Sequence, residues 1–139
     1  MKQLSLFLLG GALLANQAYA APACPANDFQ GFAEKFVSSV DVQKKFTQWP
    51  LKVTWVDDPA AEPKPTWKSK QVSKKKASFP LIESRKDAQK TGREISIEHN
   101  TEMGDHIRYR GADNGVLIYY KFKRTDSCWQ LVEMDDESV

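Results

Sequence analysis

The residues with the richest potential chemistry lie between positions 99 and 106. His99, Glu102, Asp105 and His106 carry imidazole nitrogens and carboxylate oxygens, which are ligands that zinc takes at about 2 Å. Their spacing differs from that of the helical metalloprotease motif, in which the two histidines flank a glutamate on one helical face. Gly104 within the run favours a polar turn. The sequence therefore predicts no metal site and no cofactor.

Nucleophilic and paired-carboxylate catalysis find no support in the sequence. The serines considered as nucleophiles lack the glycine-flanked turn of a nucleophile elbow; they are Ser38, Ser39, Ser78 and Ser127. Glu94 and Glu98 could form a carboxylate pair, but in a strand they point outward when Ile95 and Ile97 point inward. We therefore predict no catalytic residue.

Residues 64–76 form a basic segment that contains no acidic residue. Clustered cations raise the local concentration of anionic partners, and an aromatic ring among them can stack on a ligand. The predicted interaction strip consists of Trp67, Lys68, Lys70, Lys74, Lys75 and Lys76. A solvated face is the simpler interpretation. The lysines could also be neutralised by acidic residues near the C-terminus, namely Glu133, Asp135, Asp136 and Glu137.

The first 20 residues predict a cleavable secretory signal peptide. Lys2 gives a positive start, residues 4–14 are largely apolar, and Ala18-Tyr19-Ala20 matches the small residues that signal peptidase accepts, so cleavage is expected after Ala20. The apolar run is shorter than the roughly 20 residues that span a bilayer, so no transmembrane segment is expected after processing. We therefore expect a periplasmic or secreted protein, with residues 21–139 as a single domain. Export makes nucleic acid an unexpected partner.

Cys24 and Cys128 are the only cysteines, and in an oxidising compartment they are expected to form a disulfide bond. The bond would close a loop of 104 positions (128 minus 24) and join the N-terminus to a C-terminal strand. A lipid anchor on Cys24 is the alternative. The residues before it, Ala21-Pro22-Ala23, lack the branched apolar residue that lipoprotein processing favours, so the disulfide is the preferred prediction.

Hydrophobic spacing predicts two helices near the N-terminus. An amphipathic helix is expected over residues 28–40, with Asn27 and Gln30 resembling a capping box at its start. A shorter helix is expected over residues 41–46, capped by Asp41.

Alternating apolar residues in the rest of the chain predict an antiparallel sheet. Its strands are expected at residues 51–56, 79–82, 93–99, 107–110, 116–124 and 128–134. Residues 57–78, rich in proline and lysine, are expected to form a loop segment, in which residues 64–76 are either a solvated strand or a loop. Residues 87–92 are expected to form a turn. Asp113-Asn114-Gly115 is expected to form a tight turn, because Asn and Gly accept positive φ. Helices followed by antiparallel strands indicate the α+β class.

Two parts of the chain, residues 28–56 and 107–134, resemble exported bacterial proteins of the nuclear transport factor 2-like superfamily, in a branch of unknown function. The resemblance depends on the aromatic-rich helix, Phe46-x-x-Trp49-Pro50-Leu51, Tyr120-x-Phe122-x-Arg124 and Cys128-Trp129-x-Leu131. It implies N-terminal helices packed on a curved antiparallel sheet, which together form a cone with an apolar cavity. Enzymes of the superfamily often place an Asp-His or Tyr-Asp set in that cavity, and no such set maps onto this sequence. The basic, proline-rich middle also departs from a compact cone.

Aromatic side chains of the two matching parts could line such a cavity or fill the core; they are Phe32, Phe36, Trp49, Trp55, Tyr109, Tyr120 and Phe122. Because the fold hosts many functions, it does not choose among them. We favour a non-catalytic binding domain for an envelope protein or a small apolar ligand. An inhibitor or immunity protein that blocks an envelope enzyme, with residues 64–76 as a plug, is the alternative. A small enzyme with its site inside the cone is the third.

Overall fold

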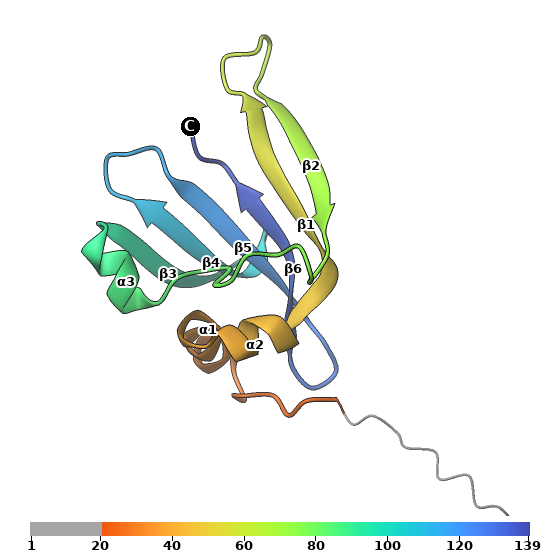
Figure 1. Cartoon of the computed structure of the whole chain (residues 1–139). Helices are drawn as coiled ribbons and strands as arrows, with labels where there is room; N and C mark the ends of the chain where they lie inside the picture. The colour runs from red at the N-terminus through yellow and green to blue at the C-terminus, as the bar shows by residue number, and fades with distance from the viewer. Residues whose placement is uncertain (1–20) are drawn as a thin grey trace, which may run out of the picture.

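The computed structural model describes residues 21–139, in which three short helices accompany one six-stranded sheet (Figure 1). The predicted signal peptide concerns residues 1–20, which lie outside the described residues. The helices are α1 (Phe29–Ser38), α2 (Val40–Lys45) and α3 (Arg85–Lys90). The strands are β1 (Thr47–Asp58), β2 (Thr66–Val72), β3 (Arg93–Asn100), β4 (Gly104–Gly111), β5 (Leu117–Arg124) and β6 (Trp129–Asp136).

Helices α1 and α2 begin at side-chain caps. Asp28 Oδ1 accepts a hydrogen bond from the Gly31 N–H at 2.7 Å, and Ser39 Oγ accepts one from the Val42 N–H at 3.3 Å. The two helices are confirmed, but their predicted caps, Asn27 and Asp41, are wrong. Several cap-forming residues stand side by side here, and the true caps are those with extended backbone, with φ of −128° at Asp28 and −138° at Ser39.

The strands form one curved, unclosed sheet in the order β2-β1-β6-β5-β4-β3. Neighbouring strands pair antiparallel except β1 and β6, which pair parallel. The chain turns between β4 and β5 at the predicted residues, with positive φ at Asp113 (54°) and Gly115 (72°) rather than at Asn114. The predicted α+β fold, with N-terminal helices on a curved sheet, is therefore confirmed.

The structure decides between two expected forms in the middle of the chain and corrects two predictions there. Residues 66–72, within the expected loop segment of 57–78, form the solvated strand of the two forms expected for residues 64–76; it is edge strand β2, and it pairs with β1. Residues 79–82 form no strand, because they include a proline and bond to a helix side chain rather than to a neighbouring strand. Helix α3 replaces part of the expected turn at 87–92, because Ser84 Oγ accepts a hydrogen bond from the Asp87 N–H and caps it.

An aromatic core joins α1 to the sheet. The rings of Phe36 and Phe122 meet edge to face with centroids 5.0 Å apart, and Phe32 contacts both Phe46 and Trp129. Phe32 and Phe36 are completely buried. The helical stripe predicted from the sequence is thus the side of α1 that packs on the sheet.

A disulfide bond connects Cys24 to Cys128, whose Cα atoms lie 5.3 Å apart. This confirms the predicted pairing, and it occupies the sulfur to which a lipid anchor on Cys24 would be attached. The bond joins the segment before α1 to the residue that precedes β6. Within residues 21–139, no helix is long and apolar enough to cross a membrane.

Candidate functional site

The helices cover only part of the concave face of the sheet, as Figure 1 shows. Near α1 and α2 the sheet residues on this face, such as Leu51, Ile107 and Leu131, are at most 1% exposed. Further along β1 and β6, Val53 and Met134 are paired in register and are only partly buried. The concave face therefore has a covered half and an open half.

A groove with a volume of about 240 Å³ lies on the open half, between the β1–β2 hairpin and the segment that follows β2. We call it the β1–β2 groove. Its lining residues are Leu51, Val53, Lys70, Val72, Lys76, Ala77, Ser78, Leu81 and Met134. Drug-sized ligands occupy pockets of roughly 300–1,000 Å³, so this groove suits a smaller molecule or part of a longer one.

Charge in the β1–β2 groove is of one sign. Lys70 and Lys76 line it, and no carboxylate does. Neither lysine forms an ion pair with any residue in the described part of the chain, although the Lys70 ammonium lies 5.7 Å from the centroid of the Trp55 ring. An apolar floor beside unpaired ammonium groups can accept a ligand that has an apolar body and an anionic end.

One wall of the groove is the chain that crosses from β2 to α3, and a buried glutamine holds it in place. Gln43 Oε1 accepts a hydrogen bond from the Leu81 N–H at 2.7 Å. Its Nε2 donates to the Ile82 carbonyl at 3.0 Å and to the Phe36 carbonyl at 2.9 Å. The Tyr120 hydroxyl donates to the Leu81 carbonyl at 2.7 Å. Because these polar groups are satisfied inside the protein, the wall is fixed against both α1 and the sheet.

A second polar cluster lies where this crossing chain meets β3 and β4. The Tyr109 hydroxyl donates to Glu83 Oε1 at 2.5 Å, and the Arg93 guanidinium lies 5.9 Å from the centroid of the Tyr109 ring. Burial and, after it, the hydrogen bond to Glu83 together raise the pKa of Tyr109 to about 12. Burial also raises the pKa of Tyr120. Both phenols are therefore protonated at neutral pH and act as hydrogen-bond donors rather than as bases.

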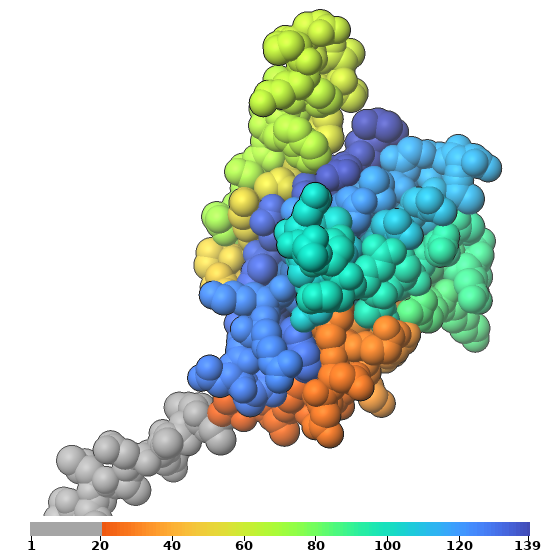
Figure 2. Space-filling model, turned by 180° about the vertical axis from the view of Figure 1, so that it is seen from behind, coloured from red at the N-terminus to blue at the C-terminus, as the bar shows by residue number. Residues whose placement is uncertain are grey.

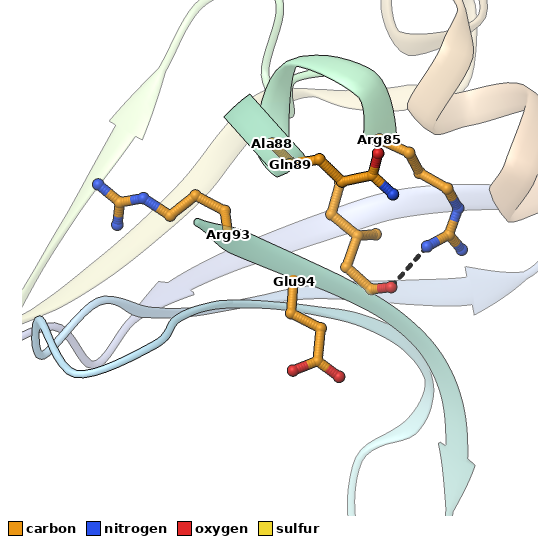
Figure 3. Close-up of a pocket in the computed structure, with 6 residues that line it drawn as sticks. Arg85, Ala88, Gln89, Arg93 and Glu94 are labelled. Atoms are coloured by element: carbon orange, nitrogen blue, oxygen red, sulfur yellow. Dashed lines mark hydrogen bonds between the residues drawn. The ribbon is translucent and has the colours of Figure 1, made fainter. Parts of the chain in front are cut away.

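A polar cleft of about 160 Å³ lies between α3 and β3 (Figure 3). Arg85 on its rim is already occupied: it donates to the Ile95 carbonyl at 2.6 Å and to both carboxylate oxygens of Glu34. This pairing lowers the pKa of Glu34 and raises that of Arg85. Figure 3 shows the Arg93 side chain pointing away from Arg85. Arg93 also lines the cleft, and its Nε and Nη1 atoms are buried without a hydrogen-bond partner among the described residues. Glu34 neutralises Arg85, so the Arg85 side of the cleft is a structural ion pair.

The structure divides the aromatic residues predicted as a cavity lining. Phe32, Phe36, Tyr120 and Phe122 are buried in the covered half, at most 7% exposed. The other residues of the set, Trp49, Trp55 and Tyr109, are only partly buried and lie at separate places. The structure therefore does not bring the set together around one space, and its role in a ligand cavity stays a prediction.

The predicted interaction strip lies along the free edge of the sheet. Its residues Trp67, Lys68 and Lys70 belong to β2, and Lys74–Lys76 follow in the turn after it. Strand geometry places Trp67 on the convex side and the two β2 lysines on the concave side. Of the acidic residues near the C-terminus, Glu133 pairs with Lys52 and Asp135 with Lys121, so neither neutralises the strip.

The four residues considered as metal ligands do not come together, because His99 and Asp105 lie on one side of the sheet, His106 lies on the other, and Glu102 lies in the turn between β3 and β4. His99 Nδ1 lies 2.8 Å from Asp105 Oδ1, whereas His106 contacts Glu98. His106 is completely buried. Its Nδ1 faces the Gly104 carbonyl at 2.9 Å. Among residues 21–139, no three His, Cys, Asp or Glu side chains converge on a common point.

Sequence reasoning did not find most of the groove residues. Val72, Leu81 and Met134 come from three segments that are far apart in the chain, and only strand pairing places Val72 beside Leu51 and Met134 beside Val53. The alternation of β1 indicated which of its residues face inward. No local sequence pattern indicates which strands pair with β1, and in particular that β6 is its parallel neighbour.

The fold and the groove together define an α+β domain in which N-terminal helices lie in the concave face of a curved, unclosed sheet. A solved structure with this architecture is an NTF2-like protein from Bacteroides fragilis NCTC 9343, with a TM-score of 0.51 and 18% sequence identity. The match covers 81% of this chain and 47% of that protein, so the chain spans about half its length. The predicted resemblance to the nuclear transport factor 2-like superfamily is thereby confirmed at the level of the fold.

The other two comparisons found no relative. No protein-family model matches the sequence, and no curated protein matches it.

Proposed function

We propose that this protein is a non-catalytic binding domain for small amphiphilic anions. The apolar part of the ligand lies in the β1–β2 groove, and its anionic end lies near Lys70 and Lys76. The observation that carries the proposal is the lining of the groove, which combines apolar side chains with two unpaired ammonium groups and no carboxylate. A fold shared with an NTF2-like protein is compatible with ligand binding.

We further propose that the protein acts in the periplasm or outside the cell. The support is the disulfide bond between Cys24 and Cys128, because such bonds persist in oxidising compartments and are rare in the cytosol.

Calorimetric titration with three probes of equal chain length tests the proposed ligand class. Octanoate, octanol and octylammonium share an eight-carbon chain and differ in the charge of the head group. We expect octanoate to bind most tightly and octylammonium most weakly, because the lysines attract an anion and repel a cation. Equal affinity for octanoate and octylammonium would overturn the proposal.

A pair of matched variants tests the two lysines. Lys70→Ala with Lys76→Ala should weaken octanoate binding by about fivefold to thirtyfold, since an exposed charge pair contributes up to about 1 kcal/mol. Lys74→Ala with Lys75→Ala removes the same charge from residues that do not line the groove, and it should change the affinity far less. An equal loss in both variants would show that only the overall charge matters.

An inhibitor that blocks an envelope enzyme is the second candidate, and the shape of the β1–β2 hairpin favours it. The hairpin extends beyond the rest of the domain (Figure 2), and the residues of β2 before Val72 are exposed. A plug of this kind would act through residues 64–76, among which Trp67 and Lys68 are exposed and do not line the groove. Trp67→Ala with Lys68→Ala should then weaken inhibition of the envelope enzyme and leave octanoate binding unchanged.

A further inference from the structure

The base of the β1–β2 hairpin gathers basic and aromatic residues from three separate segments. Lys44 lies in the last turn of α2, Trp49 lies early in β1, and Phe79 follows β2. The Trp49 indole donates a hydrogen bond to the Lys44 carbonyl at 3.3 Å, and its ring centroid lies 5.9 Å from that of Phe79. The Lys44 ammonium lies 5.2 Å from the Phe79 ring centroid. The fold thus brings residues from three separate segments together on one surface.

The charge of this region is strongly one-sided. Residues 42–56 and 66–82 together contain eight lysines and no acidic residue, although the whole chain has a net charge of only +2. Two of these lysines are paired, Lys52 with Glu133 and Lys68 with Asp57. The other six form no ion pair with any residue of 21–139, and all six are exposed. Lys45 lines a separate hollow beside the N-terminal segment. We call the remaining five the basic edge, and they are Lys44, Lys70, Lys74, Lys75 and Lys76. Such a concentration produces a positive potential at one edge of a nearly neutral domain.

We propose that the basic edge docks the protein on an anionic lipid surface. Lysine clusters are attracted to anionic lipid head groups, each as a mobile point charge that needs no fixed partner geometry. Partly exposed tryptophans suit the boundary between lipid and water, because the ring is apolar and the indole N–H is polar. Trp67 is 49% exposed on the convex side of edge strand β2, Lys70 lies on its concave side, and Trp49 lies at the base of the hairpin. A surface that meets the free edge of the sheet can therefore contact both Trp67 and Lys70.

An acidic protein surface is the competing partner, and the composition of the edge disfavours it. Protein–protein interfaces are depleted in lysine and enriched in arginine, whereas every cation of the basic edge is a lysine. The β1–β2 groove opens beside the same edge, because Lys70 and Lys76 belong to both. A lipid surface would also be a source of amphiphilic anions next to the groove, but docking itself does not require the groove to bind a ligand.

Sedimentation with lipid vesicles tests this proposal. We expect the full-length protein to bind vesicles of phosphatidylcholine mixed with phosphatidylglycerol, to bind pure phosphatidylcholine vesicles much more weakly, and to be released by salt. Lys74→Glu with Lys75→Glu should lower the partition coefficient by about tenfold or more. These residues do not line the groove, so octanoate binding should persist, which separates failure of docking from failure of ligand binding.

The matched control carries Lys86→Glu and Lys123→Glu, which change the net charge equally at exposed positions away from the basic edge. Residues 1–20 are the same in every protein compared, so their contribution cancels. Equal binding to the two kinds of vesicle, or an equal loss in the two variants, would overturn the proposal. Polyglutamate serves as a competitor, and binding to it as tight as to the anionic vesicles would replace the lipid surface with an acidic protein.

Discussion

The two halves of the concave face share the same strands and differ in what covers them. In the covered half, Phe36 from α1 meets Phe122 from β5, and both rings are nearly inaccessible to solvent. In the open half, Val53 and Met134 occupy equivalent inward positions but are only partly buried, with Lys70 beside them. The same alternation of inward side chains therefore produces a core where helices cover the sheet and a groove where they do not. The covered half therefore contributes mainly to stability, and the neighbouring open half is the part that we propose binds a ligand.

The largest expected contrast comes from shortening one side chain in each half. Phe36→Ala should lower the free energy of unfolding by about 3–5 kcal/mol, because it leaves a cavity in a closed core. Met134→Ala should cost only about 1–2 kcal/mol, because the methionine is partly solvated in the folded protein. Urea unfolding measures both values. Equal losses of unfolding free energy would show that the open half is part of the core, and the two halves would then not differ in their contribution to stability.

Gln43 connects the two halves, so its replacement should affect both. Gln43→Leu leaves the Leu81 N–H and the Ile82 and Phe36 carbonyls without their partner, which should cost about 2 kcal/mol of unfolding free energy. It should also weaken octanoate binding, because the wall of the groove loses its attachment. Gln48→Leu, at an exposed position of β1, is the control and should change neither quantity. A variant that loses stability but keeps full affinity would show that the wall is held by other contacts.

The smallest expected effect is a pH dependence at the edge of the open half. The pKa of Tyr109 in the folded protein is about 12, above the ordinary value of 10.0, so folding favours the protonated phenol. The corresponding stabilisation is complete below about pH 10 and is lost as the pH rises towards about 12. Urea unfolding at about pH 9 and about pH 11 should therefore show a smaller loss of stability in Tyr109→Phe than in the wild type. Identical losses would mean that Tyr120 alone is responsible.

Local patterns predicted much of the fold. The apolar stripe of residues 28–40 led to α1, the alternation of residues 116–124 to β5, and the Asp-Asn-Gly turn to the β4–β5 connection. The curved α+β architecture followed from these elements and from the resemblance.

What the sequence could not predict depends on contacts between distant segments. Strand β2 is an exposed edge strand, so it lacks the buried positions that would separate a strand from a loop in the sequence. Residues 79–82 have the apolar composition of a strand, but their backbone hydrogen-bonds to the Gln43 side chain rather than to a neighbouring strand. The candidate site consists mainly of such positions, so it could not be found without the strand order.

The parallel pairing of β1 with β6 has a consequence for the order in which the molecule can form. Strand β6 is the only described neighbour that connects the β1–β2 hairpin to the β3–β5 meander. During synthesis the hairpin and the meander can each form locally, but the sheet becomes continuous only when the last strand has been made. Contacts of such high sequence separation close slowly. A chain that stops before residue 129 would therefore hold two half-sheets with no shared ladder, and the groove would not exist.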